Sequence, residues 1–302
     1  MKKDMAVKYP HSANLFQFCR KVLDHKFGGI RVIDQDVGQI LGFDPADCSH
    51  WKKGKKNIRS IQAMKSIAKH LGVDERLVVD VASGEMTEWE AFYEYTGYGD
   101  FTPDPKVLDT AKKEFYRRNA NSWGKDKEQD FKKQFEVNEP EINRIVRQIH
   151  ETINFHEAPL YLPEIVAAFP DLAMRAGDKN PEKNEDPIAV LEPEAGKILI
   201  EYPMDVKMRP YIRYRIAKAM AGFFLKKYLP APDSTEHSSY INEVQTNLFA
   251  AKLLTPAYLI RKELANLDAA KDIVAQLADV FWMSKTFMNG RLKEILEKNA
   301  EI

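Results

Sequence analysis

The chain has 302 residues, its 45 lysine and arginine residues balance 45 aspartate and glutamate residues, and 44% of its residues are hydrophobic. This length suits about two domains, and the apolar content is normal for a protein with a packed core. Zero net charge excludes a polycation, so a surface that binds nucleic acid has to be local. The sequence shows neither an apolar run of membrane-spanning length nor a signal-peptide pattern, so we expect a cytoplasmic protein without a membrane partner.

Apolar residues recur at helical spacing along most of the chain, and the clearest strand signal is the stretch EAGKILIEY at 194–202. The pattern therefore predicts a mainly α (α+β) fold with a small sheet. The two cysteines, Cys19 and Cys48, lie at apolar positions of helical patterns. Two such residues make no disulfide framework, and we expect buried free thiols.

Residues 32–59 read as two short helices joined by a tight turn. Val37 and Leu41 lie on one face of the first helix, and Gly42 ends it because glycine tolerates a positive φ. Asp44 is a typical N-cap of the second helix, and Pro45 suits its first position because proline lacks the N–H that would be unpaired there.

Five cations follow the second helix within eight positions, at Lys52, Lys53, Lys55, Lys56 and Arg59. A capped helix that ends in a basic loop suits the DNA major groove, where side chains meet base edges and cations meet phosphates. The alternative is an ordinary helical hairpin whose lysine loop is solvated and does not bind DNA.

The spacing of this segment resembles the helix-turn-helix of the XRE (lambda/434 repressor-like) family over about residues 15–81. The positions that carry the resemblance are Val37, Gly38, Leu41, Gly42, Asp44, Ser49, Trp51, Lys53, Gly54 and Asn57. It implies a five-helix DNA-binding domain over 1–84, double-stranded DNA as the partner, and a homodimer that reads two half-sites. The DNA-binding residues expected from this pattern are Asp44, Pro45, Ala46, Asp47, Ser49, His50, Lys52, Lys53, Lys55, Lys56, Asn57 and Arg59.

The remaining chain divides into a helical connector over 85–140, rich in aromatic and charged residues, and a second domain over 141–302. The stretch NEVQTNLFAAKLLTP at 242–256 resembles a segment of the ImmA/IrrE family of metallopeptidase-like domains. The matching residues are Glu243, Asn247, Phe249, Ala250, Leu253, Leu254 and Pro256, and the tail LADVFWMSKTFMNGRL is similar to the closing helices of that family. The resemblance implies a zincin-like domain of helices with a small sheet.

Active members of that family carry an H-E-x-x-H helix, whose histidines bind zinc and whose glutamate is the general base. In this sequence Lys218 occupies the position of the first histidine, Ala219 that of the glutamate and Gly222 that of the second histidine. Of the zinc ligands of the family, only the downstream Glu243 remains. One carboxylate cannot hold a catalytic zinc, so we expect no metal, no cofactor and no peptidase activity at these vestigial positions. We further expect Lys218 and Glu243 to form an ion pair there.

The sequence therefore predicts a sequence-specific transcription regulator whose catalytically inactive second domain serves sensing, dimerisation or partner binding, with a protein or small molecule as its effector. One alternative is a zinc metallopeptidase that cleaves a repressor. Another is an interaction module, such as an antitoxin or phage-defence component. Nothing in the residues distinguishes repression from activation.

Overall fold

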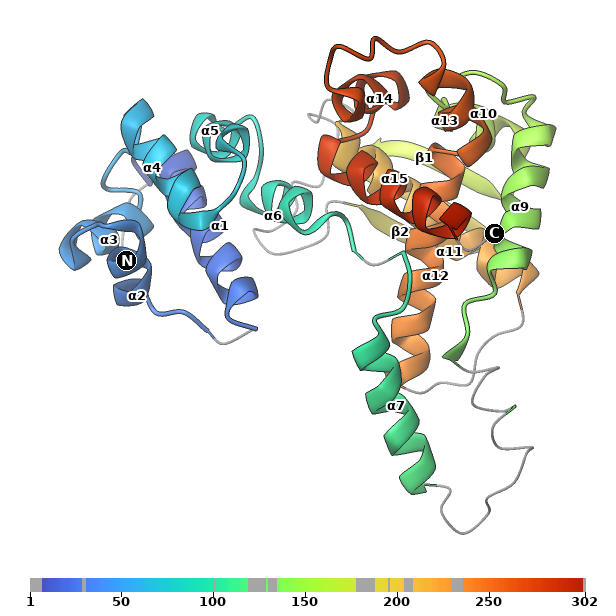
Figure 1. Cartoon of the computed structure of the whole chain (residues 1–302), viewed down its shortest axis with the longest axis horizontal. Coiled ribbons are helices and arrows are strands. Elements are labelled where there is room, and N and C mark those ends of the chain that lie inside the picture. Colours follow the sequence, from blue (N-terminus) through green and yellow to red (C-terminus); the bar gives the residue numbers. More distant parts are fainter. Residues whose placement is uncertain are drawn as a thin grey trace. The chain divides into compact units, whose positions relative to one another are not determined.

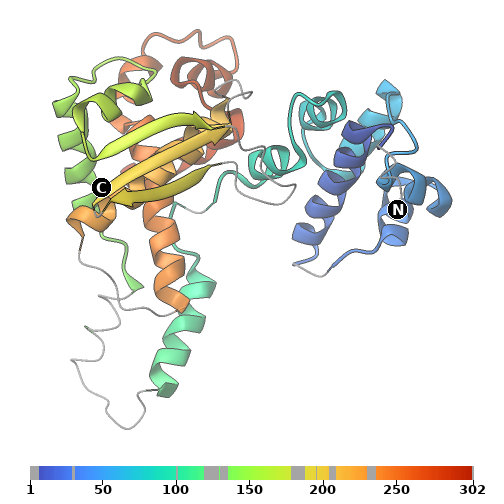
Figure 2. The same cartoon turned by 180° about the vertical axis from the view of Figure 1, so that it is seen from behind.

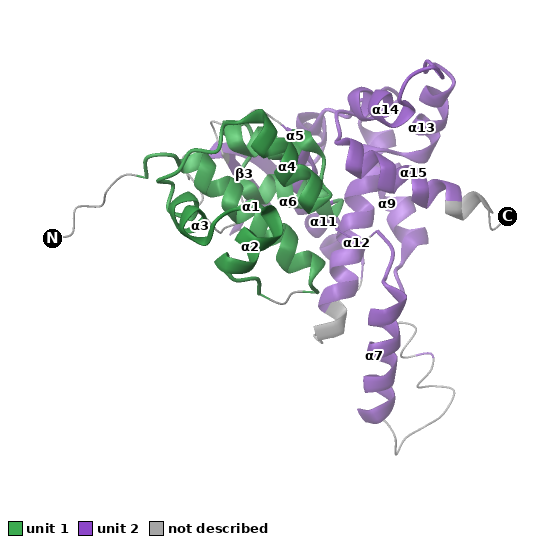
Figure 3. Ribbon diagram, turned by 60° about the vertical axis from the view of Figure 1, so that its left-hand side comes forward, with its two compact units in different colours: residues 1–97 green, residues 98–302 purple. Residues whose placement is uncertain are grey.

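The computed structural model describes residues 7–28, 31–99, 101–118, 129, 135–177, 188–194, 196–203, 209–229 and 236–300. Within these residues the chain is mainly helical, with one three-stranded sheet (Figure 1), which confirms the predicted mainly α class. The chain divides into two compact units, residues 1–97 and residues 98–302 (Figure 3). None of the described helices has the length and apolar character needed to cross a bilayer.

The first unit is built from helices around one apolar core. Its described helices are α1 (Pro10–Lys26), α2 (Asp34–Leu41), α3 (Pro45–Lys52), α4 (Ile61–Leu71), α5 (Glu75–Ser83) and α6 (Glu88–Thr96). The core includes Phe16, Val22, Trp51 and Ile67, each fully buried. Cys19 and Cys48 lie in the same core as free thiols, as predicted.

The helix ends follow from local chemistry. The side chains of Asp44, Ser60 and Asp74 each accept a backbone N–H of the helix that follows, which satisfies one of the donors that a helix start leaves unpaired. Gly42 ends α2 in the left-handed region, with φ of 74°. The cap at Asp44 and the end at Gly42 are the positions expected from the sequence.

The segment 85–140, which we expected to be a separate connector, is shared between the two units. Helix α6 packs on α1 and contributes the buried Ala91 to the first core, and the ring of Trp89 lies under Lys21, whose Nζ is 3.2 Å from the ring centroid. Helix α7 (Pro105–Arg118) belongs to the second unit, where Ala111 packs with Ile241. Residues 119–128 and 130–134 lie outside the described part.

The second unit packs helices against its small sheet. Its other described elements are α9 (Glu139–Thr152), α10 (Leu162–Ala168), β1 (Leu172–Gly177), β2 (Ala189–Glu194), β3 (Lys197–Pro203), α11 (Pro210–Tyr228), α12 (Glu236–Leu254), α13 (Ala257–Leu264), α14 (Ile273–Phe281) and α15 (Lys285–Ala300). The strand order is β1-β3-β2, with β1 parallel and β2 antiparallel to β3. The sheet lies against α11, which contacts β3 (Figure 2), and α11 packs along α12.

Only β3 carries a strand signal that the sequence makes visible. Strand β2 lies at an edge of the sheet, carries Pro193 and exposes Val190 and Leu191, so it lacks the buried alternating face that marks a strand. Strand β1 is short, and it becomes a strand through its parallel pairing with β3. Tertiary pairing decides both elements.

Candidate nucleic-acid interface

The turn between α2 and α3 packs the two helices closely against each other. The backbone N–H of Phe43 donates to the carbonyl of Gly38 at 2.8 Å, and Asp44 Oδ1 accepts from Ala46 N at 2.8 Å. A Cβ on Gly38 would lie 2.9 Å from the carbonyl oxygen of Phe43 and 3.0 Å from Cys48 Sγ. Glycine at this position therefore permits the close packing of the predicted helix-turn-helix.

The same turn geometry recurs in the second unit, between α14 and α15. There Met283 N donates to the carbonyl of Ala278 at 2.8 Å, Trp282 occupies the left-handed position with φ of 52°, and Ser284 Oγ accepts from Phe287 N at 3.1 Å. Because the turn occurs twice, its geometry alone does not define a DNA-binding element. A DNA-binding role for α3 therefore depends on the charged residues that follow this helix.

The basic loop after α3 is held in place by the buried Ser12 of α1. Trp51 Nε1 donates to the carbonyl of Ser12 at 2.6 Å, and Ser12 Oγ accepts from the backbone N–H of Ile58 at 3.0 Å. Within the loop, Gly54 has φ of 61° and its carbonyl accepts from Tyr9 N at 2.9 Å. The loop is thus tied to α1 through Trp51 and Ile58, which fixes the backbone positions of the lysines between those points.

The residues expected to contact DNA differ in exposure. Those with exposed side chains are Asp44, Pro45, Ala46, His50, Lys53, Lys55 and Arg59, and those of intermediate exposure are Asp47, Ser49, Lys52, Lys56 and Asn57. The structure therefore places all of them at or near the surface of one helix and its following loop, whereas Cys48 and Trp51 point into the core.

The five cations are not equivalent. Lys52 pairs with Asp34 at 2.8 Å and Lys56 pairs with Asp47 at 2.5 Å. Among the described residues, no acidic side chain pairs with Lys53, Lys55 or Arg59. These three cations retain an uncompensated positive charge. From the sequence alone, the paired and the unpaired cations could not be told apart.

Two further arginines lie beside this element and were missed from the sequence. A cavity of about 470 Å³ is lined by Arg20, Arg31, Asp34, Gln35 and Lys52, among other residues. Arg20 belongs to α1, and neither arginine is near the lysine cluster in the chain. Only the packing of α1 against α2 and α3 brings them to this edge.

In the second unit, the positions that the sequence compares with a zinc motif lie on two packed helices. Lys218 on α11 forms the predicted ion pair with Glu243 on α12, with 3.2 Å between Nζ and Oε1. Burial lowers the pKa of Lys218, and the charge of Glu243 opposes that shift. Ala219 is half-buried, and Gly222 is exposed with open space where a Cβ would project.

These residues do not fit a zinc ion. Among the described residues, no group of three or more histidine, cysteine, aspartate or glutamate side chains is placed to hold a metal. An ammonium group at Lys218 has no free lone pair, and a catalytic zinc needs about three protein ligands. One turn further on, Asn247 is buried and its Oδ1 accepts from the hydroxyl of Tyr214 at 3.1 Å, so this part of the helix pair has a structural hydrogen bond.

Comparison with known proteins found no match to the chain among protein-family models, curated proteins or solved structures. The two resemblances therefore depend on the residues quoted for them.

Proposed function

We propose that the protein is a sequence-specific DNA-binding transcription regulator that reads DNA with α3 and grips the phosphates with the loop after it. The observation that carries this proposal is the loop itself. It presents Lys53, Lys55 and Arg59 without acidic partners in the described structure, on a backbone fixed by Ser12. Exposed cations on a fixed backbone beside a helix are suited to contacts with DNA phosphates.

The exposed side chains near the start of α3 have the chemistry to meet base edges. Ala46 offers a methyl contact to thymine, and His50 can donate a hydrogen bond to guanine. Such contacts specify sequence, while the lysines set the register on the backbone. A single unit of this kind usually reads one half-site, so we propose a homodimer on DNA.

The test is fluorescence-anisotropy binding of the full chain to random and promoter-derived duplexes across a salt series. The variant Lys53→Ala/Lys55→Ala removes two unpaired cations from the loop. We expect weaker binding to every duplex and a log–log salt slope shallower by about two, because two phosphate contacts are lost.

The matched control is Lys65→Ala/Lys69→Ala, which removes the same charge from exposed positions of α4. The control should bind with nearly the wild-type slope. Equal losses in both variants would mean that net charge alone governs binding. Absence of wild-type binding at moderate salt would favour the interaction-module alternative, in which a stable protein partner should co-purify.

We further propose that the second unit is a non-catalytic relative of metallopeptidase-like domains, with a role in sensing, dimerisation or partner binding. The support is the Lys218–Glu243 ion pair, which places an ammonium where such an enzyme needs a zinc ligand. The wild-type chain, purified with added Zn²⁺ and then dialysed, should retain no stoichiometric zinc by elemental analysis. Retention of one zinc per chain would restore the peptidase alternative.

A further inference from the structure

The second unit contains a cavity that is separate from the Lys218–Glu243 positions. It has a volume of about 470 Å³ and lies between α9, the end of α12, the start of α13 and α15. The residues that matter for its chemistry are Arg147, His150, Glu151, Phe155 and Tyr258. Its size falls within the range of small-molecule sites, which is roughly 300–1,000 Å³.

The walls of this cavity are fixed by hydrogen bonds. The hydroxyl of Tyr258 donates to the carbonyl of Phe155 at 3.2 Å, and Phe155 N donates to the carbonyl of His150 at 2.8 Å. The rings of His150 and Phe155 lie with 4.9 Å between centroids. The hydroxyl hydrogen bond of Tyr258 and the contact between the rings of Phe155 and His150 therefore orient aromatic side chains of the cavity lining before any ligand binds, which lowers the entropic cost of binding.

His150 supplies a hydrogen-bond acceptor of defined tautomer. Its side chain is only 5% exposed, and Nε2 lies 2.9 Å from the carbonyl oxygen of Leu253. A carbonyl can only accept, so Nε2 carries the proton and Nδ1 of the neutral ring is an acceptor. Among the described residues nothing donates to Nδ1, so a ligand group with an O–H or N–H can fill this position.

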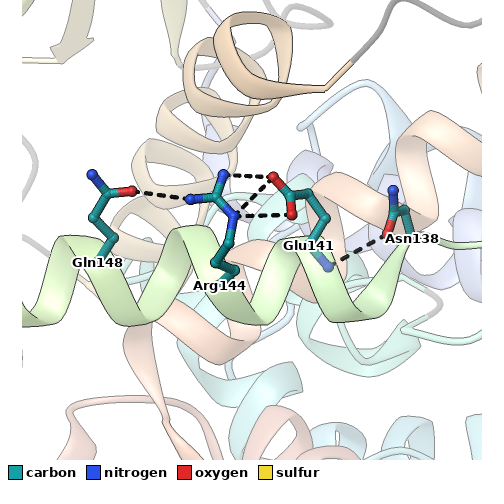
Figure 4. Close-up of polar contacts among 4 residues, drawn as sticks. All are labelled: Asn138, Glu141, Arg144 and Gln148. Carbon is teal, nitrogen blue, oxygen red and sulfur yellow. Dashed lines mark hydrogen bonds and ion pairs between the residues drawn. The ribbon is translucent and has the colours of Figure 1, made fainter.

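Arg147 supplies the positive charge. The other cations that line the cavity are engaged, since Lys252 pairs with Glu139 at 2.7 Å and Arg291 pairs with Glu294. In the part of the chain that the structure describes, Arg147 has no acidic partner. On the same helix Arg144 is held by Glu141 (Figure 4), with 3.0 Å between Arg144 Nε and either carboxylate oxygen.

Glu151 restricts the charge of the ligand. This exposed carboxylate also lines the cavity, one helical turn beyond Arg147, and it would repel a second negative charge. A planar guanidinium matches a carboxylate through two parallel hydrogen bonds. The combination favours a single carboxylate over a doubly charged phosphate.

We propose that this cavity binds a small planar aromatic acid, with its carboxylate on Arg147, its ring beside Phe155 and Tyr258, and a ring hydroxyl or N–H donating to His150 Nδ1. The site shares no residue with the DNA-binding element, so the proposal stands apart from the DNA-binding function. Its test likewise uses no DNA.

The test is isothermal titration calorimetry of the full chain with 4-hydroxybenzoate as the probe. We expect saturable one-site binding with Kd below about 1 mM. Two matched probes separate the contacts, since 4-hydroxybenzamide lacks the charge and benzoate lacks the hydroxyl. Each should bind about tenfold more weakly, because each loses one charge-assisted or buried hydrogen bond.

The variant Arg147→Gln should weaken 4-hydroxybenzoate about tenfold and leave 4-hydroxybenzamide unchanged. Arg144→Gln is the control, because it removes an arginine of the same helix that is already paired with Glu141 and does not line the cavity. Absence of saturable binding by 4-hydroxybenzoate, or an equal effect of the two arginine variants, would overturn the proposal.

Discussion

Asp47 on α3 lies within 2.5 Å of Lys56 on the following loop, measured between Oδ2 and Nζ. Both side chains are partly exposed, so the pair adds little to stability. Its consequence is electrostatic, because a carboxylate stands on the helix proposed to face DNA and neutralises one of the five cations. A carboxylate there is repelled by phosphate unless it accepts from a cytosine amine.

Replacement of Asp47 by asparagine should therefore strengthen binding to random duplex DNA. The change removes one negative charge and frees Lys56, so the log–log salt slope should become steeper by about one. Anisotropy titration across a salt series measures both effects. Asp109→Asn is the control, because it breaks a similar exposed pair with Lys113 in the second unit and should leave DNA binding unchanged.

Two helical glycines allow a matched test of packing. At Gly38 a Cβ would meet the backbone of Phe43, so Gly38→Ala should destabilise the first unit by about 1–3 kcal/mol despite the better helix propensity of alanine. At Gly222 the space is open, so Gly222→Ala should stabilise the second unit by roughly 0.5–1 kcal/mol. Thermal unfolding of each variant measures the two signs, and two changes of equal sign would contradict this account of the turn.

The proposed relation to metallopeptidases can be tested by rebuilding the missing motif. The triple variant Lys218→His/Ala219→Glu/Gly222→His restores both histidines four positions apart on α11 and removes the ammonium that pairs with Glu243. If α11 and α12 retain a zincin-like arrangement, this variant should bind one Zn²⁺ per chain.

The third ligand would be Glu243, so adding Glu243→Gln to the triple variant should weaken zinc binding by at least the roughly 10–100-fold that loss of an outer-shell partner costs. Competition with a chromophoric chelator measures both affinities. A triple variant that folds and yet binds zinc no better than the wild type would refute the proposed relation.

Burial of His150 makes the stability of the second unit depend on pH. Burial lowers the pKa of His150 from 6.5 to about 4, and the hydrogen bond to Leu253 partly opposes this shift. Between these values the unfolded chain binds a proton that the folded chain does not bind. Stability is therefore complete above about pH 6.5 and is lost as the pH falls toward 4, by about 3 kcal/mol in total.

His150→Gln retains a donor for the carbonyl of Leu253 and removes the titrating ring. Denaturant unfolding of wild type and variant between pH 7 and about pH 4 should give curves that converge as the pH falls. Curves that stay parallel over this range would show that burial of His150 contributes nothing to the pH dependence.

Local chemistry made much of the fold predictable from the sequence. Asp44 begins a helix and Gly42 ends one as expected, because capping and left-handed termini depend on neighbouring residues only. Strand β1 escaped prediction because its parallel pairing with β3 joins residues well apart in the chain, such as Leu172 and Ile198. Strand β2 escaped because it is an exposed edge strand that carries Pro193, although it pairs with the neighbouring β3. The extent of the connector was missed for the same reason, since α6 and α7 join different units through tertiary packing.

The sequence by itself determined the two short helices of residues 34–52 with the turn between them, and the residue types Lys218, Ala219 and Gly222 at the positions compared with a zinc motif, because both are matters of residue identity at fixed spacing. The tertiary structure decided which cations of the basic loop are paired, since Asp34 and Asp47 reach Lys52 and Lys56 only when α2, α3 and the loop are packed. It also decided that Arg147 and His150 face a shared cavity with Tyr258, more than 100 residues away in the chain. Ion pairs and cavities depend on distances of a few ångströms, and the chain acquires those distances only when it folds.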